Sequence, residues 1–287
     1  IANLIVDGAV HTIISSNPSL DITLTNTTIT SSTNLELIRS ASNGQITCAE
    51  LTSTAAVFAG LSAGNDKLGL IVTDAASVSQ SITMIAAVSS TSAIIFQGGV
   101  SDTVANLKSA IASDFDKLDS IVLNDPDVTI TISDDAFASS AATIAGTDLS
   151  TIGGKTTGTV TVSNAVKITG AASELTAALV TTGSLVVAAT ALVTVSDAAD
   201  TSIAGTVLSA IGAKTGGVVT VTNDIIITGS NTEVTAALVT TDTLVVAATA
   251  KVTISDATDV SIAGTVLSAI GAKTSGVVTV TNDIVIT

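Results

Sequence analysis

The chain has 287 residues, a formal net charge of −15 and 46% hydrophobic residues, but no Trp or Tyr and only four Phe. Its core must therefore consist of small aliphatic side chains, and its nine Lys and Arg are too few for a surface that binds nucleic acid or an anionic membrane. One His and one Cys argue against Ser-His-Asp catalysis, a Cys/His zinc site and an internal disulfide, and no stretch approaches the roughly 20 apolar residues of a spanning helix.

Residues 1–65 contain short strand-like stretches that are rich in β-branched side chains and separated by polar turns. These stretches read LIVDG, HTIISS, LDITLT and QITCAEL. Their spacing is the least regular in the chain, so we predict an irregular, strand-rich cap at the N-terminal end of a repeat array. Cys48, in the last stretch, is expected to be a small buried core residue.

Residues 66–142 follow a freer pattern of strand, helix and strand. The strongest helix signal in the chain covers residues 101–124, where Asp102 is placed to cap the N-terminus. The apolar positions expected on its buried face are Val104, Leu107, Ile111, Phe115 and Leu118. A Thr-rich strand is predicted after Pro126. We therefore interpret this region as divergent strand–helix–strand repeats.

Residues 143–287 consist of regular repeats with a period of 59 residues. Residues 191–228 align with 250–287 without a gap, and only six positions differ. The same offset relates ITGAASELTAALVTT, which begins at Ile168, to ITGSNTEVTAALVTT, which begins at Ile227. Such close agreement between neighbours indicates that each repeat packs against a copy of itself.

Each repeat divides into two similar halves of roughly 30 residues, and each half reads as a strand, a short helix and a second strand. Val252 and Ile254, for example, alternate with Thr253 and Ser255, as in a half-buried strand. One half has a single thin apolar face and cannot bury it alone, so the halves must stack. The predicted fold class is an α/β solenoid of strand–short helix–strand coils with parallel strands.

An acidic or amide residue ends nearly every predicted strand. The acids at these positions in the second half of the chain are Asp134, Asp197, Asp224, Asp256 and Asp283. One interpretation is helix capping, because a short carboxylate can accept hydrogen bonds from the free N–H groups of the helix that follows. The other is a ladder of calcium sites, because this ion prefers oxygen ligands and would offset the negative charge. The sequence leaves both interpretations open.

Residues 101–137 resemble a repeat of very large secreted proteins of Gram-negative bacteria, including cyanobacteria. The resemblance lies in SDTVANL, in LDSIVLND and in the Thr-rich stretch that follows. It implies a helix over the first motif and strands over the other two. Proteins of this kind are adhesins, surface-layer proteins or components of extracellular fibres, often with calcium-binding modules elsewhere in the chain.

These observations predict a structural protein rather than an enzyme. A polysaccharide lyase or hydrolase would need clustered acids or a basic group in a cleft lined by aromatic sugar platforms, which the composition does not favour. We expect an extracellular repeat protein that self-assembles into a cell-surface layer or filament. Its expected partners are copies of itself and, as a further candidate, a cell-surface polysaccharide. The alternative is a spacer or stalk region of a large bacterial adhesin.

Overall fold

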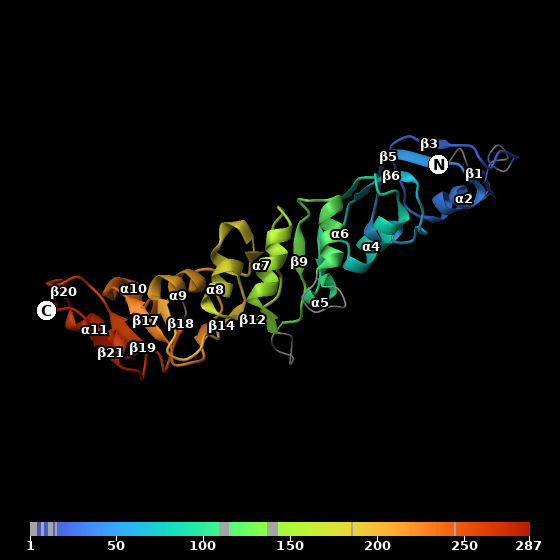
Figure 1. Ribbon diagram of the computed structural model, residues 1–287. Helices are drawn as coiled ribbons and strands as arrows, with labels where there is room; N and C mark the ends of the chain where they lie inside the picture. The colour runs from blue at the N-terminus through green and yellow to red at the C-terminus, as the bar shows by residue number, and fades with distance from the viewer. Residues whose placement is uncertain are drawn as a thin grey trace. The chain divides into compact units, whose positions relative to one another are not determined.

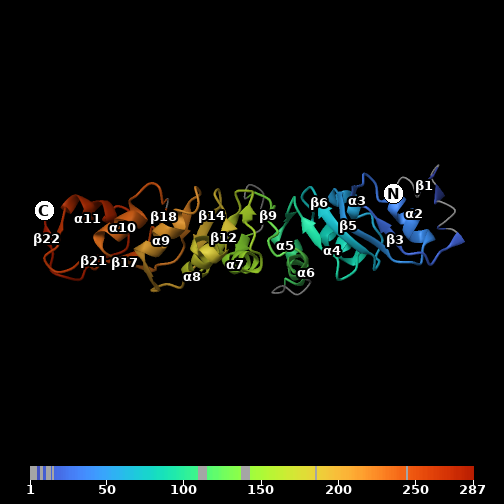
Figure 2. The same cartoon turned by 90° about the horizontal axis from the view of Figure 1, so that it is seen from above.

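The computed structural model describes residues 5–6, 9–10, 14, 16–108, 115–136, 143–184, 186–243 and 245–287 (Figures 1 and 2). The chain forms two compact parts. The N-terminal part comprises Ile1–Thr131 and Lys155–Thr159, and the C-terminal part comprises Ile132–Gly154 and Val160–Thr287. The division predicted from sequence pattern, at 65/66 and 142/143, stays a prediction.

A parallel sheet with short helices forms the N-terminal part. In this sheet β5 lies between β3 and β6, β6 also pairs with β7, and β4 pairs with the later residues of β5. Its strands are β3 (Ile22–Leu24), β4 (Thr27–Thr28), β5 (Ile46–Ser53), β6 (Lys67–Val72) and β7 (Ile94–Phe96). A separate antiparallel pair is formed by β1 (Ile5–Val6) and β2 (Ala9–Val10). Two further strands are β8 (Val100–Asp102) and β9 (Ile130–Ile132). The helices are α2 (Thr33–Ala41), α3 (Ala55–Phe58), α4 (Val78–Ala87), α5 (Val104–Leu107) and α6 (Asp116–Asn124).

The helix predicted over residues 101–124 is wrong as a single element. It is two helices, because Lys108 takes an extended conformation and ends α5 after one turn, and α6 begins after Phe115. Thr103, rather than Asp102, caps α5, and Ile111 lies outside the described residues. A continuous helix of this length would extend roughly 35 Å, far beyond α2 and α4, which have nine and ten residues. The LDSIVLND motif lies in α6 and is not a strand.

Two parallel sheets organise the C-terminal part. The first, called the β10 sheet, has the order β10-β12-β14-β16-β18, and the second, called the β15 sheet, has the order β15-β17-β19-β21. The strands of the β10 sheet are β10 (Thr143–Ala145), β12 (Lys167–Gly170), β14 (Leu192–Val195), β16 (Val219–Val221) and β18 (Val245–Val246). Those of the β15 sheet are β15 (Ser202–Ala204), β17 (Ile226–Gly229), β19 (Lys251–Ile254) and β21 (Val278–Val280). Two more parallel pairs are β11 (Val160–Val162) with β13 (Val186–Val187), and β20 (Ser261–Ile262) with β22 (Val285–Ile286).

The sheets are staggered along the sequence by one repeat. Adjacent strands within a sheet are one half-repeat apart, as in the pairing of Ile168 with Val193 and of Val193 with Val219. Residues 59 positions apart, such as Ile168 and Ile227, instead take equivalent places in different sheets. The half-repeat is therefore the unit of strand pairing, and the full repeat is the period at which a new sheet begins.

Every helix of the C-terminal part connects a strand of a later sheet to a strand of an earlier one. Thus α9 leads from β15 to β16 and α10 leads from β17 to β18. Figure 1 shows the last helices following one another along this part, with α10 in contact with both α9 and α11. The helices are α7 (Gly146–Lys155), α8 (Ala172–Leu175), α9 (Gly205–Gly212), α10 (Asn231–Leu238) and α11 (Gly264–Gly271), and α8 continues into a π-helical turn (Thr176–Val180) and a short 3-10 turn (Thr182–Ser184).

The core consists mostly of aliphatic side chains from strands and helices. The predicted alternation in β19 is confirmed, because Val252 and Ile254 are buried and Thr253 is only half-buried. Leu208 in α9 and Val234 in α10 are fully buried. Cys48 is also buried, as predicted. The α/β class with parallel strands is therefore established.

No helix among the described residues combines the length and the apolar composition needed to cross a membrane.

Candidate functional site

Two of the predicted strand-end acids, Asp197 and Asp256, cap helices, but not the helices that follow them. Asp197 Oδ2 accepts a hydrogen bond from the main-chain N–H of Ala172 at 2.7 Å. Asp256 Oδ2 accepts one from Asn231 N at 2.7 Å, and its Oδ1 accepts a second from the side-chain amide of Asn231 at 2.7 Å. Ala172 and Asn231 are the first residues of α8 and α10. Each carboxylate thus caps the helix of the preceding half-repeat.

Parallel pairing explains why the capped helix lies earlier in the chain. Gly170 at the end of β12 lies beside Val195 at the end of β14, and Gly229 lies beside Ile254 in the same way. The carboxyl ends of parallel strands meet at one edge of a sheet. A residue just past one strand therefore reaches the helix that begins just past its neighbour. For Asp197 and Asp256, the prediction that the acid caps a helix is confirmed, but the prediction that it caps the helix that follows is wrong.

The N-terminal part repeats this arrangement. Asp74 accepts a hydrogen bond from Ala55 N, the first residue of α3, at 2.6 Å. Asp102 accepts one from Val78 N, the first residue of α4, at 3.0 Å. A strand-end carboxylate that caps the helix of the preceding half-repeat is therefore common to both parts.

The other three predicted acids accept hydrogen bonds at their main-chain oxygens. Asp224 and Asp283 are exposed, and their main-chain oxygens accept hydrogen bonds from Asp200 N at 2.9 Å and Asp259 N at 2.8 Å. Asp134 is buried, and its main-chain oxygen accepts a hydrogen bond from the Asn164 amide at 2.7 Å. The same link joins Asn223 to Asp197 and Asn282 to Asp256, at 2.6 Å in both cases. Asn–Asp hydrogen bonds thus link neighbouring half-repeats at three places.

The structure does not bring these carboxylates together as a metal centre. Within the described ranges, no three His, Cys, Asp or Glu side chains are grouped closely enough to hold a metal ion. The carboxylates of Asp197 and Asp256 are already occupied by main-chain N–H donors. Binding of calcium to these residues stays a prediction.

Removal of one capping carboxylate tests its contribution to stability. We expect Asp256→Ala to lower the free energy of unfolding of the C-terminal part by about 1–2 kcal/mol, because the first N–H of α10 loses its acceptor. Asp256→Asn should cost less, since an amide oxygen also accepts. The matched control is Asp224→Ala, which keeps the main-chain oxygen that bonds Asp200 N. Urea unfolding measures all three variants, and equal losses in Asp256→Ala and Asp224→Ala would contradict the capping role.

The same acids provide the test for calcium. If they bind the ion, a chelator should lower the unfolding midpoint of the wild-type protein but not that of the Asp197→Asn, Asp256→Asn double variant. An unfolding midpoint of the wild-type protein that a chelator leaves unchanged would leave helix capping as their whole role.

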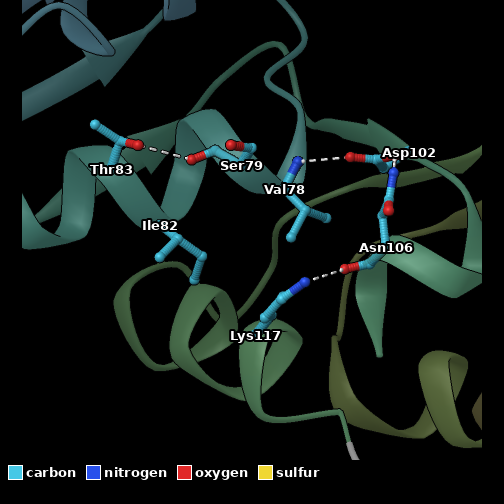
Figure 3. A pocket seen from close by; sticks show the side chains of 7 residues that line it. All are labelled: Val78, Ser79, Ile82, Thr83, Asp102, Asn106 and Lys117. Atoms are coloured by element: carbon cyan, nitrogen blue, oxygen red, sulfur yellow. Dashed lines mark hydrogen bonds between the residues drawn. The ribbon is translucent and has the colours of Figure 1, made fainter. Parts of the chain in front are cut away.

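A cavity of about 290 Å³ lies between α4, α5 and α6 in the N-terminal part (Figure 3). Val78 and Ile82 lie on its apolar side. Asp102 is occupied by the amides of Val78 and Asn106, and Lys117 donates to the main-chain oxygen of Asn106 at 3.5 Å. The lining thus offers one carboxylate and one amine, each bound to the protein itself, and no pair of acids for acid–base chemistry.

Sequence reasoning missed a nearly buried arginine in α2. Arg39 Nε donates to Asp66 at 2.9 Å, and Nη1 donates to Glu36 at 2.8 Å and to the main-chain oxygen of Ser62 at 2.8 Å. Its Nη2 donates to the main-chain oxygen of Ala87 at 3.0 Å. The partners come from segments up to 48 residues away. This arrangement, called the Arg39 cluster, ties α2 to the end of α4 and to the loop before β6.

A second missed residue is Asp125, a buried acid that follows α6. Its Oδ2 accepts a hydrogen bond from Phe96 N at 2.7 Å. Burial raises the pKa of Asp125 and neighbouring Asp127 adds to this effect, while the hydrogen bond from Phe96 opposes it. Asp125 therefore binds the end of β7, a strand that lies earlier in the chain. The capping acids, in contrast, bind the first residue of an earlier helix.

Comparison with protein families, with curated proteins and with solved structures found no match.

Proposed function

We propose that this protein is an extracellular structural repeat protein that self-assembles into a cell-surface layer or filament. In this proposal the half-repeats continue as an α/β solenoid, and the array supplies shape and contact surface rather than a reaction. Carboxylates that cap neighbouring helices and an arginine bound to four acceptors stabilise the fold.

A periodic set of exposed valines carries the proposal. Val187 in β13 and Val246 in β18 are 49% and 48% exposed and lie 59 residues apart. Val218 and Val277 are also exposed and have the same separation. Val246 lies beside exposed Thr220 on the solvent side of the β10 sheet.

A repeated apolar surface of this kind fits a matching surface on a second copy. Exposed aliphatic groups at a constant interval can all meet the equivalent groups of another copy at once, so weak contacts add along the array. The net charge of −15 disfavours nucleic acid and anionic membranes as partners.

Substitution of two of these valines tests the proposal. Negative-stain electron microscopy of the wild-type protein should show ordered sheets or filaments. Val187→Lys with Val246→Lys should leave dispersed molecules with an unchanged circular dichroism spectrum, because burial of charged lysines in an apolar contact is costly. Leu123→Lys is the matched control, since Leu123 is an exposed aliphatic residue of the N-terminal part.

Wild-type protein that stays dispersed with and without calcium would count against a layer or filament. That result would favour the adhesin stalk, which requires no association between copies. Assembly in the double variant equal to that of the wild-type protein would exclude the valine surface as the contact.

A further inference from the structure

A second cavity, of about 410 Å³, lies beside α8 in the C-terminal part. Ligand sites in proteins typically have volumes of roughly 300–1,000 Å³. Its lining comes from α8, from the residue that follows β14 by two positions, and from β15 and α9. One acid lies there among hydroxyl and aliphatic side chains: Asp197, Ser173, Ser202, Ile203 and Val207. This cavity, called the Asp197 cavity, suits a ligand with one charged group on a short apolar chain.

The acid in this cavity has one carboxylate oxygen available. Asp197 Oδ2 accepts a hydrogen bond from Ala172 N at 2.7 Å, whereas Oδ1 has no hydrogen-bond partner in the part of the chain that the structure describes. The first N–H of α8 is therefore already bound, and the cavity presents the second carboxylate oxygen rather than helix N–H groups. Such an oxygen forms its strongest hydrogen bonds with a cationic donor.

The next repeat closes the equivalent position with its own side chain. Asn231 stands 59 residues after Ala172, and its amide donates to Asp256 Oδ1 at 2.7 Å. Asp256 is accordingly only 8% exposed, while Asp197 is half-buried. The protein thus shows that a nitrogen donor completes this carboxylate. The methyl group of Ala172 cannot donate, so at Asp197 the donor must come from elsewhere.

A lysine side chain has the required chemistry, because an ammonium group ends a flexible aliphatic stem. Lys214 is exposed, and its side chain has no ion pair or hydrogen bond with any residue that the structure describes. Its turn is held in place, since Thr215 Oγ1 donates to the main-chain oxygen of Ala191 and accepts from Gly217 N at 3.0 Å. Lys214 follows the last turn of α9, whereas Val207, in the first turn, lines the cavity. The lysine and the cavity therefore lie at opposite ends of α9.

We propose that the Asp197 cavity binds the side chain of Lys214 from a second copy of the chain. The ammonium group would donate to Asp197 Oδ1, and the methylene groups would pack against Ile203 and Val207. Charge complementarity favours this occupant, because the cavity offers an acid and the second copy offers an exposed lysine without an ion pair. The inference rests on the proposed self-assembly and names one contact within it.

The arrangement of the two sites determines the kind of assembly. Cavity and lysine lie at different places on each copy, so the contact is head-to-tail and one copy can bind two others. Head-to-tail contacts that do not close into a ring generate open filaments. This contact is therefore consistent with a filament or layer rather than with a closed dimer.

A small amine tests the cavity without any association between copies. The probe is n-butylammonium, which has the stem and charge of a lysine side chain, and the protein is the dispersed Val187→Lys, Val246→Lys variant. We expect the probe to shift the methyl NMR resonances of Ile203 and Val207 in a saturable manner. Sodium butyrate, which carries the opposite charge on a similar chain, should not shift them.

Two reciprocal variants in the same background locate the binding. Ala172→Asn should weaken the response to butylammonium by about 10-fold or more, because the new amide occupies Asp197 Oδ1 as Asn231 occupies Asp256. Asn231→Ala should open the equivalent position, so that the methyl groups of Ile262 and Val266 respond as well. Circular dichroism checks that both variants are folded.

The second measurement identifies the occupant. In the chain with its native valines, Lys214→Gln should raise the concentration needed for assembly by about 10-fold, because glutamine keeps much of the stem but loses the charge. Ala172→Asn should have the same effect. The matched control is Lys155→Gln, because Lys155 holds the equivalent position one repeat earlier and is already paired with Asp119. This control should assemble as the wild-type protein does.

Three results would overturn the proposal. They are the absence of a methyl response to butylammonium, an equal response in Ala172→Asn, and assembly of Lys214→Gln at the wild-type concentration. A wild-type protein that assembles but does not bind butylammonium would contradict this inference and leave the proposed function intact. A wild-type protein that binds butylammonium but never assembles would contradict the proposed function, and with it Lys214 of a second copy as the occupant.

Discussion

Gly212→Ala should lower the free energy of unfolding of the C-terminal part by about 2–3 kcal/mol, whereas Gly271→Ala should leave it unchanged or raise it by up to about 1 kcal/mol. Both glycines are the last residue of a helix with the sequence GTVLSAIG. The first contacts the backbone at Thr243, and the second faces open space. The same substitution in the same local sequence should therefore lower the free energy of unfolding at Gly212 but not at Gly271.

The direction of the change in the free energy of unfolding depends on what lies next to each helix. A methyl group at Gly212 would overlap the main-chain oxygen of Thr243, whose hydroxyl donates to Thr240 O and Ala237 O and holds this turn in place. Backbone cannot move aside as a flexible side chain can, so α9 and α10 must separate. At Gly271 only the higher helix propensity of Ala is felt.

Urea unfolding followed by circular dichroism, with hydrogen exchange to locate the change, measures both effects. Gly153→Ala is a second variant of the first kind, because a Cβ there would lie closer than 3.0 Å to the main-chain oxygen of Ser184. Equal effects of Gly212→Ala and Gly271→Ala would contradict close packing between neighbouring half-repeats as the reason for these glycines.

Arg39→Ala should lower the free energy of unfolding of the N-terminal part by about 3–5 kcal/mol. The guanidinium is the shared donor for two acids and two main-chain oxygens, and its side chain is only 9% exposed. Its removal leaves Asp66 and Glu36 near each other, with their opposite charge gone. Burial opposes ionisation of Glu36, but hydrogen bonds from Ser62 and Arg39 outweigh it and hold the pKa of Glu36 below its usual value.

Arg39→Lys should recover only part of the loss, since a single ammonium group cannot reach four acceptors in a fork. The control is Lys155→Ala, which removes an ion pair with Asp119 in which both side chains are more exposed. That variant should lose about 1 kcal/mol or less in thermal or urea unfolding. A loss in Arg39→Ala no larger than that of the control would show that the Arg39 cluster does not stabilise the fold.

The sequence was sufficient to predict the local pattern. Alternation of Val252 and Ile254 with Thr253 marked a strand, because strand periodicity depends only on which side faces the core. Repetition also showed that halves of roughly 30 residues must stack.

Contacts between residues that are distant in sequence could not be predicted in the same way. Near-identity at a spacing of 59 did not identify the strand partners of Ile168 and Ile227, since each has its sheet neighbour one half-repeat away. Arg39 carried no signal in the sequence, since its partners Asp66 and Ala87 are distant along the chain. The capping target of Asp197 required the strand register, which no local signal contains.

The stagger of the sheets limits how such a gene can change in length. Recombination between the similar stretches at residues 191–228 and 250–287 would add or remove 59 residues, and every strand would keep an equivalent neighbour. Loss of the half-repeat that contains Thr243 would instead remove the backbone against which Gly212 packs. Inheritance should therefore favour variants whose lengths differ by whole multiples of the repeat.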